Sequence, residues 1–292
     1  MKTDRSDSVI LVTLKSYGDF LIAYRALLNS IKHMPERNVV IITGRHIHPL
    51  AEALGVPNGV IKYVGDISLK DVPPAFDVNR CGLIAAAKSL ISLRMQVHDL
   101  ARPMHTLIFD RLGAREKFIA GRFPVDALPA TAGNICLAYD NFLGNYPFIG
   151  NSDLSRINLN LKEALIVPAS RIERKVLPKA VIFDLYQQLK EFGVNSRVLL
   201  LEGEGVNVPP QVPVNTIPRQ FSALISALKQ SDLVVSADSL PAHLGDYLDR
   251  PTFVVSPQPN HYWLPRTAYL QSACAHFEDL SPFKIWLQKY FK

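Results

Sequence analysis

The chain has 292 residues, of which 48% are hydrophobic and 20% are charged. A chain of this length and composition is expected to form two globular domains, which excludes an intrinsically disordered or a fibrous protein. The formal net charge of +6 fits an anionic partner, and it fits equally a modest excess of charge that serves solubility alone.

Several other classes of protein are disfavoured by short patterns. No apolar stretch reaches the roughly 18 residues that a membrane-spanning helix needs, and the first residues, MKTDRSDS, show no cleavage site of a signal peptide. Cys81, Cys136 and Cys274 lie far apart with no CxxC pair, so neither a metal site nor a disulfide framework is expected. No basic and aromatic platform predicts nucleic-acid binding. We therefore expect a cytoplasmic protein.

The amino-terminal half alternates strand and helix patterns. Buried-strand runs are expected at residues 9–14, 38–43, 60–64 and 106–110. Apolar residues at helical spacing are expected to form helices at 19–32, 49–54 and 83–97. This alternation predicts a parallel sheet that is covered by helices on both faces. From Gly133 to Asn160 the pattern weakens into Gly, Asn, Pro and aromatic residues, and we place a domain boundary near 151–160.

A second alternation fills the carboxyl-terminal half. Strands are expected at 164–167, at 197–201, in an apolar run that ends at Ala237, and at 252–255. Helices are expected at 179–192, 221–229 and 242–248, whereas the prolines of NVPPQVPVNT (207–216) forbid a regular helix there. The segment SPFKIWLQKYFK (281–292) predicts an amphipathic helix, which either packs on its own domain, the interpretation we favour, or lies on a membrane surface.

Polar residues follow one strand of the second half and open the next helix. Asp238, Ser239 and His243 belong to the motif DSLPAH, which comes directly after the apolar run. In open parallel sheets, ligands bind outside the carboxyl ends of the strands, where turn amides and a helix N-terminus favour negative charge. The pattern therefore predicts a phosphate-bearing ligand at this turn, although a packing role explains His243 equally well.

A basic cluster precedes the first helix of the second half, and a Gly-Asp pair follows the first strand of the chain. Positive side chains at a helix start oppose the helix dipole, so the cluster indicates either a bound anion, which we favour, or a solvated loop. Its members are Arg171, Arg174, Lys175 and Lys179. Taken by itself, Asp19 after Gly18 is explained as the N-cap of a helix.

Three segments together resemble the motifs of glycosyltransferase family 9, the family of the lipopolysaccharide heptosyltransferases. They are LVTLKSYGDFLIAYRALLNSIK (11–32), IVPASRIERKVLPKAVIFDLYQQLKEFG (166–193) and the stretch from Ser231 to Pro259 with DSLPAH. The resemblance covers most of the chain. It implies the GT-B fold, in which two Rossmann-like domains, here 1–155 and 156–275, face each other across a cleft. A helix within 276–292 would then pack back toward the first domain.

The resemblance also implies the reaction and the roles of several residues. The enzyme would transfer a sugar, with ADP-linked heptose as the leading donor, to a bacterial surface glycan, with inversion and without a metal or other cofactor. Asp19 would be the general base, and either Glu202 or Glu204 would contact the ribose. The residues matched to the diphosphate site are Ser170, Lys175, Asp238, Ser239, Leu240 and His243.

The sequence departs from the family at two places, and it leaves the acceptor open. Leu240 stands where the family has Gly, so its side chain must point away from the diphosphate or narrow the site. The Pro-rich stretch after Gly205 replaces a helix near the ribose. Lys15, Arg45 and His46 are candidate contacts of an anionic glycan or glycolipid acceptor at the cytoplasmic face of the inner membrane.

Two alternative functions remain compatible with the same residues. An enzyme that cleaves or epimerises nucleotide sugars would need a further carboxylate or His near the sugar, and Glu202, Glu204 or His243 could supply it. A protein of a different class would bind a nucleotide or glycan without catalysis, and Leu240 would then mark a site that has lost its donor.

Overall fold

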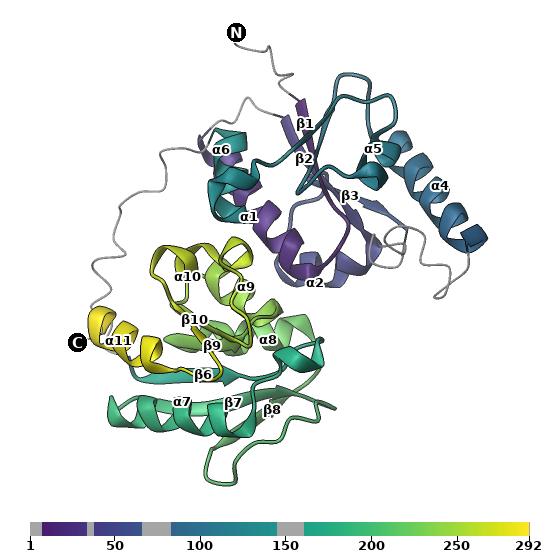
Figure 1. Cartoon of the computed structure of the whole chain (residues 1–292). Helices are drawn as coiled ribbons and strands as arrows, with labels where there is room; N and C mark the ends of the chain where they lie inside the picture. The colour runs from purple at the N-terminus through teal and green to yellow at the C-terminus, as the bar shows by residue number, and fades with distance from the viewer. Residues whose placement is uncertain (1–7, 34–37, 66–82, 145–160, 292) are drawn as a thin grey trace. The chain divides into compact units, whose positions relative to one another are not determined.

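The computed structural model describes residues 8–33, 38–65, 83–144 and 161–291. The chain divides into two compact units, Met1–Tyr146 and Pro147–Lys292, and each is built around one parallel sheet (Figure 1). The prediction of two α/β units is therefore confirmed. The predicted boundary at 155/156 and Cys81 lie outside the described residues.

The first unit contains a five-stranded sheet in the order β3-β2-β1-β4-β5. Its strands are β1 (Ser8–Thr13), β2 (Asn38–Gly44), β3 (Ile61–Val64), β4 (Thr106–Phe109) and β5 (Val125–Ala127). Its helices are α1 (Tyr17–His33), α2 (His48–Ala53), α4 (Leu83–Leu100), α5 (Ala114–Ala120) and α6 (Ile135–Leu143), with short 3₁₀ turns η1 (Arg45–Ile47) and η2 (Ala130–Ala132). In the register of the central strands, Leu11 pairs with Ile41 on one side and with Ile108 on the other.

Helices cover both faces of this sheet, which explains why every residue of β1 is buried. Figure 1 shows α1 and α6 on one face and α4 and α5 on the other. Ile10 and Val12 of β1 belong to one core cluster with Leu93 and Val97 of α4 and Ile119 of α5. Alternate residues of the strand therefore pack against different helix layers, as the side-chain period of two requires.

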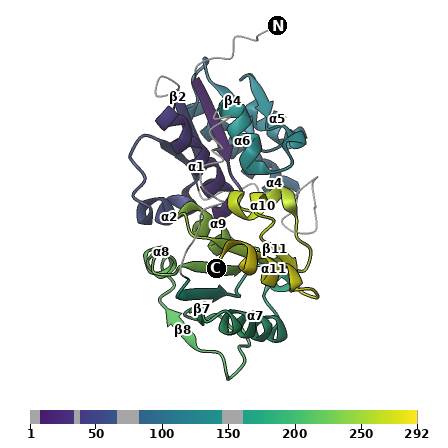
Figure 2. The same ribbon diagram turned by 90° about the vertical axis from the view of Figure 1, so that its left-hand side faces the viewer.

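The second unit contains a six-stranded parallel sheet in the order β11-β10-β9-β6-β7-β8. Its strands are β6 (Glu163–Val167), β7 (Asn195–Leu201), β8 (Val214–Ile217), β9 (Leu233–Ala237), β10 (Thr252–Ser256) and β11 (Cys274–His276). Its helices are α7 (Lys179–Glu191), α8 (Phe221–Lys229), α9 (Leu240–Tyr247), α10 (Arg266–Leu270) and α11 (Ser281–Tyr290), with 3₁₀ turns η4 (Glu173–Lys175) and η5 (His261–Trp263). Figure 1 and Figure 2 show α7 on one face and α8 and α9 on the other.

Both sheets are wound in the same way. In each, the first strand is central, the next two strands extend the sheet to one side, and the chain then crosses to the other side. The strand order therefore reverses between β1 and β4 in the first unit and between β6 and β9 in the second. Such a switch point, at the carboxyl ends of the strands, is where ligands of open α/β sheets bind.

Several elements lie where the sequence predicts none, and α6 and β8 are the two whose sequences argue most against them. Helix α6 occupies the stretch in which the pattern weakens, with Asn134 accepting a hydrogen bond from the Cys136 amide at 2.9 Å and Gly144 closing it at φ +73°. Its Tyr139 and Asp140 are buried. Strand β8 lies in the predicted loop, and it fits between Pro213 and Pro218 because an edge strand tolerates flanking prolines.

The last helix, α11, packs on its own unit. Its Phe283 and Trp286 lie in the core of the second unit, with ring centres 4.8 and 5.3 Å from that of Phe253. The apolar side of α11 therefore packs in the core of its own unit, as the sequence predicts. The return of the helix toward the first domain stays a prediction. Among the helices of the described ranges, none combines the length and the apolar character needed to cross a membrane.

Candidate functional site

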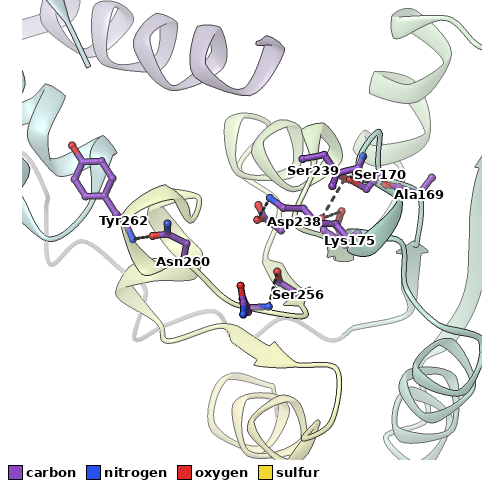
Figure 3. A network of polar contacts seen from close by, with 12 residues as sticks. Ala169, Ser170, Lys175, Asp238, Ser239, Ser256, Asn260 and Tyr262 are labelled. Carbon is purple, nitrogen blue, oxygen red and sulfur yellow. Dashed lines mark hydrogen bonds and ion pairs between the residues drawn. The ribbon is translucent and has the colours of Figure 1, made fainter. Parts of the chain in front are cut away.

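The strongest candidate site lies at the switch point of the second unit, where Lys175 and Asp238 form an ion pair (Figure 3). The Lys175 Nζ donates to Asp238 Oδ2 over 2.6 Å, and both side chains are only partly exposed. Asp238 follows β9 directly, and Lys175 ends η4 in the connection that follows β6. Since β6 pairs with β9, with Val167 opposite Ser236, the two connections meet at the same edge of the sheet.

The connection 168–178 is folded so that one basic side chain turns inward. The Leu177 amide donates to the Pro168 carbonyl at 3.0 Å, which closes the loop, and Leu177 is buried. Within the loop, the Ile172 amide donates to Ser170 Oγ at 3.3 Å, and the Lys175 amide donates to the Ile172 carbonyl at 2.8 Å. Lys175 is half-buried, whereas the other members of the predicted cluster, Arg171, Arg174 and Lys179, are exposed.

Ser239 ties the two turns together. Its hydroxyl donates to the carbonyl of Ala169 at 3.0 Å and also approaches that of Ala237 at 3.3 Å (Figure 3). The serine occupies the N-cap position of α9, yet no side-chain hydrogen bond caps this helix, and its first turn contains no acidic residue. Neither the N-cap residue nor the first turn of α9 thus neutralises the free amides there, which is an electrostatic condition that favours an anion, although the carboxylate of Asp238 lies just before the N-cap.

Leu240 is the first residue of α9, so its backbone is helical. Among the described residues, only Asp249 and Ser272 combine a side chain with a positive φ, so this position does not need the conformational freedom of Gly. Whether the Leu240 side chain narrows a diphosphate site stays a prediction. His243 is half-buried one turn further along α9, and its predicted contact with a phosphate is likewise untested.

Gly245 explains how closely α9 lies on the sheet. A Cβ atom at this position would lie 2.5 Å from Thr252 Oγ1 and 3.4 Å from the side chain of Val234. The helix therefore packs directly on β9 and β10, and its N-terminus is held at the end of β9 beside Asp238.

The structure separates the roles of the two glutamates after β7. Glu204 folds back, and its Oε2 accepts a hydrogen bond from the Leu201 amide at 2.9 Å, across a turn in which Gly203 has φ +81°. The side chain of Glu202 is exposed, while its carbonyl accepts from Arg219 Nε at 3.0 Å. Glu204 thus stabilises the turn, and Glu202 is the better candidate for contact with a ligand.

Ser256 and Asn260 also lie at the carboxyl ends of the strands of the second unit, and sequence reasoning had not selected them. The Ser256 Oγ accepts from the Gln258 amide at 3.5 Å, and Asn260 Oδ1 accepts from the Tyr262 amide at 3.1 Å (Figure 3). Their position in SPQPN directly after a predicted strand was the available signal.

In the first unit, Asp19 has a different local role from the predicted one. Helix α1 begins at Tyr17, so Ser16 is the N-cap and the assignment of Asp19 to that position is wrong. The Ser16 hydroxyl donates to Asp19 Oδ2 at 2.7 Å, and the Asp19 amide approaches Ser16 Oγ at 3.4 Å. The carboxylate of Asp19 therefore lies in the first turn of α1, where the helix dipole stabilises negative charge.

The other predicted residues of the first unit gather at the same edge of its sheet. Lys15 forms an ion pair with Asp110, which follows β4 directly and which sequence reasoning missed as a site residue. The rings of Tyr17 and His46 meet edge to face with centres 5.8 Å apart, so the connections after β1 and β2 touch. Arg45 is exposed. Contact of Lys15, Arg45 and His46 with an acceptor stays a prediction.

Neither unit shows a metal centre within its described part. In residues 8–33, 38–65, 83–144 and 161–291, no three His, Cys, Asp or Glu side chains come together as a metal ion would require. Cys136 and Cys274 are not joined in a disulfide. Metal independence stays a prediction about the reaction.

Comparison with known proteins identifies the fold. A scan against protein-family models finds no match, and neither does a search of curated proteins. Among solved structures, the E. coli heptosyltransferase WaaC with ADP-2-deoxy-2-fluoro heptose matches with a TM-score of 0.59 and 14% identity, over 95% of this chain and 97% of that one. A glycosyl transferase family 9 structure from Veillonella parvula has a TM-score of 0.60 and 13% identity, over 100% and 92%.

A third match is the E. coli ADP-heptose lps heptosyltransferase II, with a TM-score of 0.52 and 12% identity, over 96% of each chain. At such identities the likeness concerns the fold alone. The chain has the two-domain α/β architecture of these transferases over nearly its whole length, which confirms the predicted fold class.

Proposed function

We propose that the protein is a glycosyltransferase, which moves a sugar from a nucleoside diphosphate donor to an acceptor hydroxyl with inversion at the anomeric carbon. The observation that carries the proposal is the Lys175–Asp238 pair beside the uncapped N-terminus of α9. A cation and a set of backbone amides converge there, at the switch point of a sheet, and both favour a diphosphate.

The donor would be bound by the second unit. The Lys175 ammonium and the first amides of α9 would hold the diphosphate, which would have to compete with the Asp238 carboxylate for Lys175. Ser170 lies in the loop 168–178 and His243 in α9, and Glu202 would contact the ribose. ADP-heptose is the leading donor, because two of the similar structures are named for ADP-heptose or its fluorinated analogue.

The chemical step would use the carboxylate of Asp19. As the acceptor oxygen attacks the anomeric carbon, Asp19 accepts the hydroxyl proton, and the bond to the diphosphate oxygen breaks on the opposite face of the sugar. The Ser16 hydroxyl, which donates to Asp19 Oδ2, keeps the carboxylate oriented. The charge of the leaving diphosphate would be stabilised by Lys175 and by amides, so the step needs no metal ion.

The acceptor would be an anionic glycan or glycolipid of the bacterial surface, taken at the cytoplasmic face of the inner membrane. Lys15, His46 and Arg45 are its candidate contacts in the first unit. The charge of Lys15 is balanced by Asp110, so an anionic group of the acceptor would have to compete with this carboxylate.

The test is a thermal-shift titration with ADP, GDP and UDP in the presence of EDTA. A ligand at 100 times its Kd adds about 2.7 kcal/mol of stability when it binds only the folded protein. We expect one nucleotide to stabilise the wild type and to stabilise Lys175→Ala clearly less at the same concentration. Lys179→Ala is the matched control, because it removes an exposed lysine of the same basic cluster. No shift with any nucleotide would contradict the donor site, and a shift without sugar transfer would favour a binding protein.

A further inference from the structure

Helix α4 turns a row of large apolar side chains toward the solvent. Ile84 is 73% exposed, Ile91 49% and Met95 61%. Their spacing of seven and four residues places them on one side of the helix. The opposite side, with Leu93 and Val97, belongs to the core of the first unit. The exposed row is therefore not needed to hold the sheet and its helices together.

Helix α5 packs beside α4 (Figure 1) and adds an exposed aromatic residue and further positive charge. Phe118 is 37% exposed, and the Arg94 guanidinium of α4 lies 4.8 Å from the centre of its ring. Lys88 of α4, Lys117 of α5 and Arg122, which follows α5, are exposed. We call this surface the α4–α5 face, formed by Ile84, Ile91, Met95, Phe118, Lys88, Arg94, Lys117 and Arg122.

Negative charge is sparse on this surface. Asp99 is exposed at the end of α4, whereas Glu116 of α5 is buried and accepts a hydrogen bond from the Gly113 amide at 3.1 Å. The α4–α5 face thus combines four cationic groups with four apolar side chains, and Lys88 lies between Ile84 and Ile91 on the same side of α4. Single exposed apolar residues are common on protein surfaces, but an apolar row interspersed with basic residues has the chemistry of a surface that binds anionic lipid.

Helix α11 is an amphipathic helix whose apolar side is buried in its own unit. It too is rich in lysine, yet Phe283, Trp286 and Leu287 are buried, and of its large apolar residues only Ile285 is largely exposed, at 62%. An amphipathic sequence alone therefore does not predict a docking surface in this protein. The α4–α5 face differs because its apolar residues are additional to those used in the core.

We propose that the α4–α5 face docks on an anionic phospholipid surface. The apolar side chains would enter the boundary between headgroups and acyl chains, and the basic side chains would lie at the level of the headgroup phosphates. The proposal rests on the proposed function in one respect: a glycolipid acceptor would be found at such a surface and would give the protein a reason to bind there. Lipid binding itself requires neither a donor nor catalysis.

The test is flotation of the full chain with vesicles of phosphatidylglycerol and phosphatidylcholine, compared with vesicles of phosphatidylcholine alone. We expect binding to the anionic vesicles that weakens as salt is raised. Lys117→Gln with Arg122→Gln should weaken it roughly 25-fold, because each basic residue near an anionic membrane contributes about a fivefold factor. Ile91→Ser with Met95→Ser should weaken binding to the same vesicles by at least about tenfold.

Ile285→Ser is the matched control, since it removes an equally exposed isoleucine from α11. The proposal is wrong if the wild type does not float with anionic vesicles, or if the control loses as much binding as the α4–α5 variants. It is also wrong if Ile91→Ser with Met95→Ser leaves flotation intact, and a change from dimer to monomer in light scattering would then assign the apolar row to contact between two copies of the chain. The nucleotide-induced thermal shift of the same variants reports separately on the donor site.

Discussion

The two units carry the same ion pair at the same place in the same sheet winding. In the first unit Lys15 pairs with Asp110, and in the second Lys175 pairs with Asp238. Each aspartate directly follows the strand beyond the switch point, β4 or β9, and each lysine lies in the connection after the central strand, β1 or β6. The strand order and the ion pair alone therefore do not show which of the two units binds the donor.

The helices that begin at these edges do distinguish the units. In the first unit α1 and α5 have an acidic residue in the first turn, Asp19 and Glu116. In the second unit α7 and α9 have none. A carboxylate in the first turn offsets the positive end of the helix dipole and repels a further anion. The first unit is thus suited to hold a carboxylate base, and the second to hold an anionic ligand.

The largest effect is expected from Asp19→Asn, which removes the carboxylate but keeps the size of the side chain. A general base contributes about 10²- to 10⁴-fold to a rate, so kcat for release of the nucleoside diphosphate in the presence of acceptor should fall by that order. Nucleotide binding, read from the thermal shift, should stay unchanged because the donor is assigned to the other unit. Wild-type turnover by Asp19→Asn would show that the acidic first turn of α1 serves only the helix.

A smaller effect is expected when the two lysines are exchanged for alanine one at a time. Lys175→Ala should weaken nucleotide binding about 10- to 100-fold, the usual worth of a hydrogen bond to a charged group. Lys15→Ala should leave nucleotide affinity unchanged, although it breaks the equivalent pair. The measurement is titration calorimetry with the nucleotide that gives the thermal shift. Equal losses in both variants would contradict the division of roles between the units.

Much of the fold was predictable because it depends on local periodicity. Runs of buried strand residues and apolar residues at helical spacing predicted both parallel sheets, the central strands and most of the helices. Helix α6 was missed because buried aromatic residues and flanking Gly and Asn resemble a loop, and β8 was missed because prolines flank a strand of four residues. In both cases tertiary packing outweighs a weak local signal.

The site was predictable only in part, for a different physical reason. A position directly after a buried strand was enough to select Asp238 and Ser239, since the ends of parallel strands meet at one edge. The partner of Lys175 was not predictable, because it lies 63 residues away and depends on how the loop 168–178 folds. Asp110 was missed because the predicted strand, 106–110, includes it, whereas β4 ends at Phe109. The start of α1 decided whether Asp19 or Ser16 is the cap, and sequence patterns place helix ends only to within a few residues.

The smallest expected effect concerns acid stability, and it applies to His105 of the first unit. Burial, with the positive charges of Lys62 and Arg102, lowers the pKa of His105 below its ordinary value of 6.5. Its Nδ1 accepts a hydrogen bond from the Arg102 amide at 2.8 Å, which requires that this nitrogen be unprotonated. The unfolded chain therefore takes up a proton at a higher pH than the folded chain does.

The contribution of His105 to stability is thus complete above pH 6.5 and is lost as the pH falls from there through the lower pKa of the folded state. We expect the free energy of unfolding, measured in urea at pH 7.5 and at pH 5.0, to decrease toward acid in the wild type. In His105→Asn this decrease should be smaller, because Asn accepts the Arg102 hydrogen bond without titrating. An equal decrease in both proteins would assign the acid sensitivity to other groups, and a decrease confined to an unfolding transition of the second unit would exclude His105 as its cause.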